Sequence, residues 1–170
     1  MKRILIVILF VCFALPFSAC GKKTDELQVP ANFYYLRQDF LYGVEDGVIS
    51  SEAREAVHIK DNLTVLLTEY LKGPKENQLT RCVPASVSVV AVKREDRTIT
   101  LMLSPDFARL NGVDLTLACA CLSMTVLDYT DADAVEIMAE DELLGDSEQI
   151  KMTREDLLLL DSQNTTEATT

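Results

Sequence analysis

The clearest periodic pattern in the chain predicts a helix over residues 63–71. Its apolar residues recur at i, i+3, i+4, i+7 and i+8, the spacing of one helix face, and they are Leu63, Leu66, Leu67, Tyr70 and Leu71. Asp61 or Asn62 can cap its start, and Gly73 followed by Pro74 is a typical helix end. Burying this face contributes roughly 7–15 kcal/mol before entropy costs, so we expect the helix to pack on a sheet.

A second apolar helix is predicted over residues 114–129. One of its faces consists of Leu115, Ala118, Cys119, Leu122, Val126 and Tyr129. Leu117, Cys121 and Met124 give it a second, partly apolar face. A helix that is apolar on two sides needs cover on both, so we expect something other than the first sheet to lie on that side.

Alternating apolar and polar residues predict the strands. Residues 86–92 and 98–103 alternate on either side of the polar tetrad 94–97, a pattern that predicts a β-hairpin. Residues 33–36 predict a first strand and residues 134–138 a last one. The resulting order is β-α-β-β-α-β. It predicts an α+β fold with a small mixed β-sheet and two helices on one face.

The remaining segments have weaker patterns. Residues 37–60 predict a loop with a short extended piece near 47–49, and residues 51–58 can form a helical turn or two. Residues 153–156 have the composition of a capping box. The four leucines at 157–160 can then continue as a short helix or pair as a strand.

The N-terminus has the pattern of a secretory leader. A basic pair at residues 2–3 precedes fourteen apolar residues at 4–17, which are too few to span a bilayer as a helix. Residues 17–21, Phe-Ser-Ala-Cys-Gly, resemble the bacterial lipobox, in which the Cys is diacylated and the leader is cut before it. We therefore favour lipid attachment at Cys20. The alternative is ordinary secretion with cleavage near Ala19.

Lipid attachment would anchor the chain to the membrane. Two acyl chains on Cys20 contribute about 20 kcal/mol of gross burial energy, at about 0.8 kcal/mol per methylene. Residues 20–31 follow as a polar tether without an apolar period. In this tether Lys22 and Lys23 lie at the height of the lipid headgroups, where each adds about 1 kcal/mol of attraction.

The charge of the chain argues against nucleic-acid binding. The sequence carries 16 basic and 27 acidic residues, a net charge of −11. Removing Lys2 and Arg3 with the leader leaves 14 basic residues and a net charge of −13. Such a surface repels phosphate backbones, so no nucleic-acid partner is expected.

The cysteines give little indication of chemistry. Three remain after loss of the leader and acylation of Cys20, namely Cys82, Cys119 and Cys121, so at most one internal disulfide can form. Cys119 and Cys121 point to different helix faces and cannot bond to each other, and whether Cys82 pairs with either stays open. We favour the view that all three are small buried apolar residues.

No arrangement of residues predicts catalysis or a resident metal or cofactor. The sequence lacks the common nucleophile, zinc-protease, P-loop, dinucleotide and EF-hand motifs. Its one histidine, His58, stands without a catalytic motif and is best interpreted as a solvated or half-buried side chain. Acidic clusters at 140–142 and 146–148 could bind calcium loosely, but they are more typical of a solvated surface.

Several short motifs follow one another along the chain, namely Leu66-Leu67, Tyr70-Leu71-Lys72-Gly73-Pro74, Val83-Pro84, Leu103-Ser104-Pro105-Asp106-Phe107, Thr125-Val126 and Val135-Glu136-Ile137. In this order they resemble the sporulation and spore germination (GerMN) domain of bacterial envelope lipoproteins. The resemblance covers residues 33–156, most of the chain after the leader. It implies a small domain similar to ring-building modules of envelope complexes, acting through protein contacts and without catalytic residues.

Together these observations predict four parts. They are the leader 1–19, the lipidated Cys20 with its tether to residue 31, a GerMN-like domain at 32–156, and a largely disordered extension at 157–170. The predicted function is that of a non-catalytic lipoprotein on the extracytoplasmic face of the cell membrane, with a bilayer contact through Cys20. Its domain would bind an envelope protein or another copy of itself, through an edge strand or the second face of the helix at 114–129, in sporulation or germination. The alternative is a lipoprotein that binds a small ligand or cation.

Overall fold

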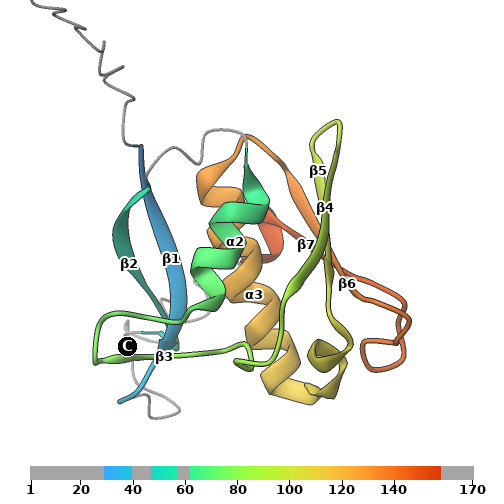
Figure 1. Cartoon of the computed structure of the whole chain (residues 1–170), viewed down its shortest axis with the longest axis horizontal. Coiled ribbons are helices and arrows are strands. Elements are labelled where there is room, and N and C mark those ends of the chain that lie inside the picture. Colours follow the sequence, from blue (N-terminus) through green and yellow to red (C-terminus); the bar gives the residue numbers. More distant parts are fainter. Residues whose placement is uncertain (1–28, 40–46, 57–61, 158–170) are drawn as a thin grey trace, which may run out of the picture.

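Two β-sheets with α-helices between them make up the folded part of the chain (Figure 1). The computed structural model describes residues 29–39, 47–56 and 62–157. In chain order the elements are β1 (Val29–Arg37), β2 (Ile49–Ala56), α2 (Leu63–Leu71), β3 (Leu79–Thr80), β4 (Val89–Glu95), β5 (Thr98–Leu103), the 3-10 helix η1 (Pro105–Arg109), α3 (Gly112–Tyr129), β6 (Ala134–Ala139) and β7 (Ile150–Thr153). The predicted leader, Cys20, His58 and the tail from residue 158 lie outside the described residues.

The two sheets differ in size and pairing. The smaller sheet has the order β2-β1-β3 and is antiparallel throughout. The larger has the order β4-β5-β6-β7, in which β5 and β6 run parallel and the other neighbours antiparallel. Parallel neighbours need a long crossover, and here η1 and α3 carry the chain from the end of β5 back to the start of β6.

A sheet lies on each side of α3 (Figure 1). The helix contacts β1 on one side and β6 and β7 on the other. On the β1 side, the Tyr34 N–H donates a hydrogen bond to Thr125 Oγ1 at 3.1 Å, and Cys121 is 0% exposed. Strand β1 therefore covers Cys121 on the second face of this helix, whereas Leu117 and Met124 on the same face are half-buried. That a partner docks on this face stays a prediction.

Burial also explains the composition of α3. Among the described residues it is the one helix long and apolar enough to cross a membrane, but 56% of it is buried inside the domain. A helix enclosed by two sheets needs apolar residues nearly all round. We therefore assign α3 to the protein core.

The strongly periodic elements were predicted correctly. The helix predicted at 63–71 is α2, and the Asn62 side chain caps it by accepting a hydrogen bond from the Val65 N–H at 3.2 Å. The hairpin is β4 and β5, with Asp96 at a φ of 51° in its turn. The predicted second helix and last strand are α3 and β6. The α+β fold class is confirmed.

The helical turns predicted within residues 51–58 are wrong, because β2 occupies residues 49–56. The inward-facing positions of this strand carry Glu52 and Arg54, whereas Ser51 and Ala53 are exposed. The usual alternation of apolar inside and polar outside is therefore inverted, and the sequence pattern conceals a strand.

Three further expectations are corrected. The strands form two sheets and not one small mixed sheet, because β1, β2 and β3 pair only among themselves within the described residues. Strand β1 begins at Val29, so residues 29–31 belong to it and not to the tether. The short strands β3 and β7 were not predicted, since two and four residues carry too little periodicity.

The predicted capping box is present after β7. The Thr153 N–H donates to Asp156 Oδ2 at 2.9 Å, and the Asp156 N–H donates to Thr153 Oγ1 at 3.2 Å. Residues 154–157 are helical as a result, so Leu157 continues as helix.

A buried ion pair ties β2 to the end of α2. Glu52 and Arg54 form a salt bridge with side chains 2% and 8% exposed. The Arg54 guanidinium donates to the Gly73 carbonyl at 2.7 Å and lies 4.6 Å from the centre of the Phe33 ring. Glu52 also accepts the backbone N–H groups of residues 75 and 76 at 2.9 and 3.0 Å. The ion pair therefore joins β2, the end of α2 and the loop that follows α2.

The hydrogen bonds to Glu52 set its ionisation. Burial opposes the charged form, but the backbone N–H groups of Glu76 and Lys75 and the Arg54 guanidinium outweigh it, and the pKa of Glu52 is lowered from its usual 4.5. A carboxylate with a lowered pKa stabilises the fold above its unfolded pKa. That contribution is lost as the pH falls through the folded pKa.

We therefore predict that Glu52→Gln lowers the free energy of unfolding at pH 7 by about 3 kcal/mol or more, because Arg54 stays buried without its counter-charge. Urea unfolding of both proteins between pH 7 and 2 should show this difference narrowing below pH 4.5, as Glu52 of the wild type becomes protonated. The other carboxylates are common to both proteins and cancel in the comparison. A difference independent of pH would contradict the assignment.

Candidate functional site

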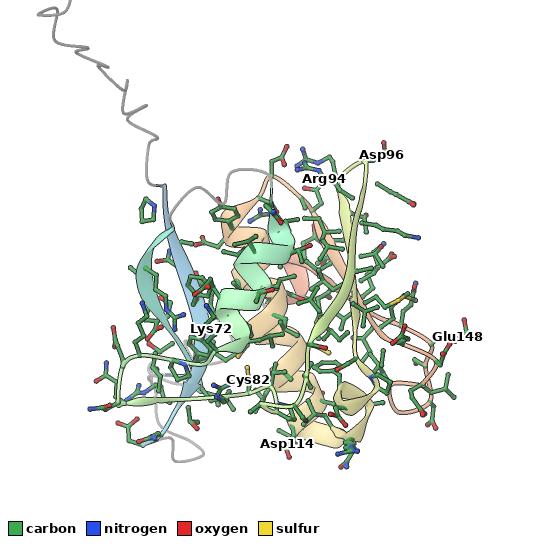
Figure 2. All side chains as sticks on the ribbon, in the orientation of Figure 1. Lys72, Cys82, Arg94, Asp96, Asp114 and Glu148 are labelled. Atoms are coloured by element: carbon green, nitrogen blue, oxygen red, sulfur yellow. The ribbon has the colours of Figure 1, made fainter. Side chains whose placement is uncertain are left out.

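A pocket lies beside the loop that carries the Val83-Pro84 motif. Its volume is about 340 Å³, and its walls are Leu36, Arg81, Cys82, Val83, Pro84, Leu110 and Asp114. Figure 2 shows Cys82 and Asp114 in the half of the domain away from Asp96 in the β4–β5 turn. The pocket thus joins the end of β1, the loop before β4 and the start of α3.

The backbone at the end of α2 is shaped by Gly73. Its φ of +90° favours glycine, and a Cβ built there would lie 2.5 Å from Arg81 Nε. The Arg81 guanidinium donates to the carbonyl of Leu71 at 2.5 Å and to that of Lys72. These carbonyls are unpaired at a helix end, where a positive charge is favourable. Arg81 therefore caps α2 and forms one wall of the pocket.

Cys82, in the pocket wall, contacts one of two stacked aromatic rings. Tyr70 stacks on Tyr35 with ring centres 4.8 Å apart and planes 4° from parallel. The Tyr70 hydroxyl and the Cys82 thiol share a hydrogen bond of 2.8 Å. Burial raises the pKa of Tyr70, and the neighbouring Cys82 raises it further. At neutral pH this phenol is therefore uncharged and acts as a hydrogen-bonding group.

The three described cysteines are free and buried, as predicted for Cys82, Cys119 and Cys121. Burial raises the pKa of Cys119 to about 12, with a smaller contribution from Cys82. Burial also raises the pKa of Cys121. For Cys82, burial opposes the thiolate, but hydrogen bonds with Cys121 and Tyr70 outweigh it and lower the pKa. Cys82 is thus the most acidic of the three thiols.

The described residues contain no candidate metal centre. No three His, Cys, Asp or Glu side chains among them are placed to hold a metal ion. No described histidine can serve Cys82 as a general base, because His58 lies outside the described residues. The acidic residues 140–142 and 146–148 are exposed along the chain between β6 and β7.

Sequence reasoning did not identify the pocket or the roles of Arg54 and Arg81. Gly73 and Pro74 indicated where α2 ends, and this part of the prediction is confirmed. Nothing in the local pattern shows that an arginine eight positions after Gly73 caps the helix. That contact depends on the path of the loop through β3.

We predict that Gly73→Ala destabilises the domain by roughly 1–3 kcal/mol, because alanine is strained at this φ and its Cβ displaces Arg81 from the α2 carbonyls. Gly145→Ala is the matched control, since Gly145 also has a positive φ, +63°, but nothing lies within 4 Å of its Cβ. Thermal unfolding of both variants should show the larger loss for Gly73→Ala. Equal losses would show that Arg81 plays no part.

Comparisons with known proteins agree with this architecture. The structure of the first GerMN domain of the sporulation protein GerM from Bacillus subtilis is similar, with a TM-score of 0.58 and 18% identity over 75% of this chain and 99% of that chain. The tandem GerMN domains of the same protein match with a TM-score of 0.51 and 21% identity, over 70% of this chain and 41% of that chain. At these identities the likeness shows the fold alone. No curated protein matches the sequence.

The family assignment rests on a sequence comparison. The model of the Germane family, described as sporulation and spore germination, matches residues 32–145. The match includes the α2 end at Gly73, the β4–β5 hairpin and all of α3. Because it spans 114 of the 170 residues, the chain belongs to the Germane family.

Proposed function

We propose that this protein is a non-catalytic lipoprotein, anchored by acylated Cys20 to the extracytoplasmic face of the cell membrane. Its Germane domain would act there through protein–protein contacts, in sporulation or spore germination. The observation that carries the proposal is the short distance along the chain between Cys20 and the domain. Strand β1 begins at Val29, nine positions after Cys20.

This spacing limits where the domain can act. Nine residues of extended chain span at most about 30 Å, so a domain tethered at Cys20 stays within that distance of the lipid headgroups. A partner would then be a membrane or envelope protein, or another copy of this chain. The family's link to sporulation and germination supports such a setting.

The outer edge of β4 is the surface we propose for contact. The two surfaces considered from the sequence were a sheet edge and the second face of α3, and on that face β1 already packs against the helix and Cys121 is buried. Strand β4 lies at the edge of the larger sheet, with β5 as its one strand neighbour among the described residues. Val90, at a bulge in this strand, is 42% exposed. An exposed strand edge offers unpaired backbone groups to another chain.

Lipid attachment can be tested directly. Cells grown with a clickable palmitate analogue should label the wild-type protein and Cys12→Ala, but not Cys20→Ala, because the acyl chains are carried by residue 20 alone. Cys12→Ala is the matched control, since Cys12 lies within the leader. Labelling of Cys20→Ala at the wild-type level would contradict the proposal.

Contact through β4 predicts a position-dependent loss of binding. In cells that naturally carry the protein, Val90→Asp should reduce the partner recovered after in-place crosslinking about tenfold, because a charge replaces an apolar contact. Val65→Asp is the matched control: Val65 lies on α2 and is likewise 42% exposed. An equal loss in both variants, or none in Val90→Asp, would rule out this edge.

The pocket favours a second candidate, a lipoprotein that binds a small ligand. It combines apolar walls with the charges of Arg81 and Asp114, as small-molecule sites do. One observation argues against a small-ligand site: the Arg81 guanidinium already donates hydrogen bonds to the carbonyls at the end of α2. A thermal-shift screen of small ligands on the wild type and Asp114→Asn separates the two candidate functions. A ligand held by Asp114 should raise the melting temperature of the wild type more than that of Asp114→Asn.

A further inference from the structure

Two of the buried thiols lie close enough to share a hydrogen bond, and one of them belongs to a residue that lines the pocket. Cys82 lies in the loop before β4 and Cys121 on α3, and the two thiols are within hydrogen-bonding contact. Both belong to one core cluster and are 8% and 0% exposed. The Tyr70 hydroxyl, 2.8 Å from Cys82 Sγ, holds the Cys82 side chain in this position.

The third cysteine does not share this arrangement. Cys119 lies two positions before Cys121 on the same helix, and side chains so spaced point to different sides. It is buried, but no hydrogen bond joins it to Cys82. Of the two cysteines on α3, Cys121 is therefore the one placed to bond with Cys82.

We propose that Cys82 and Cys121 form a reversible intramolecular disulfide that locks the loop before β4 onto α3. The oxidant is a disulfide, either a small molecule or the active site of a thiol–disulfide oxidoreductase. The Cys82 thiolate attacks one sulfur of the oxidant, which forms a mixed disulfide and releases the first thiol. The Cys121 sulfur then attacks Cys82 Sγ, which releases the second thiol. Two electrons and two protons pass from the pair to the oxidant.

The pocket offers the oxidant an approach to Cys82 before Cys121. Cys82 lines the pocket and is 8% exposed, whereas Cys121 does not line it. Cys121 lies behind it and is fully buried, as suits the second, resolving thiol. The lowered pKa of Cys82, caused by hydrogen bonds with Cys121 and Tyr70 that outweigh its burial, supports the same order of attack.

A redox titration of the purified full-length protein tests the proposal. The protein is equilibrated with reduced and oxidised glutathione at a series of ratios, free thiols are alkylated, and tryptic peptides are identified by mass spectrometry. Cleavage after Arg81 and Arg109 places Cys82 in the peptide 82–93, and Cys119 and Cys121 together in the peptide 110–151. Oxidised protein should yield these two peptides joined, with one alkylated cysteine.

Matched variants identify the partner thiol. Cys119→Ala should keep the link between the peptides 82–93 and 110–151, and Cys121→Ala should lose it. Oxidation should also raise the melting temperature of the wild type and Cys119→Ala by roughly 5–15 °C, because the link closes a loop of about 40 residues. A link that survives in Cys121→Ala, or no link at the most oxidising ratio in protein with native circular dichroism, would overturn the proposal.

Discussion

The ion pair between Glu52 and Arg54 is the contact on which the arrangement of this domain most depends. The two charged side chains are only 2% and 8% exposed. Burying such charges costs free energy unless each donor and acceptor is hydrogen-bonded. Arg54 reaches the Gly73 carbonyl, and Glu52 accepts two N–H groups of the loop that follows. The pair thereby fixes where α2 ends and where the chain turns toward the pocket.

Those contacts also explain which parts of the fold the sequence could predict. Helix α2 and the β4–β5 hairpin bury apolar side chains with a regular period, so their patterns were sufficient. Strand β2 was mistaken for helical turns because its buried positions hold Glu52 and Arg54, whose burial depends on partners more than fifteen residues away. The division into two sheets depends likewise on α3 being covered on both sides.

The candidate site could likewise be predicted from the sequence only in part. The sequence indicated the helix end at Gly73, and it identified Cys82, Cys119 and Cys121 as buried residues. It could not show that Arg81 caps α2 or that Cys82 meets Cys121, because each contact joins segments brought together by the loop through β3. For the same reason the sequence could not show that β1 packs against part of the second face of α3.

We propose that this Germane domain is held close to the membrane and acts by contact with another protein through the β4 edge. The most direct test places a photoreactive amino acid at residue 90 or, as the control, at residue 65, in cells that naturally carry the protein. The account predicts a discrete crosslinked product, either a defined envelope protein or a second copy of this chain, from position 90 and not from position 65. A protein that remains uncrosslinked at position 90, although anchored and folded, would contradict it.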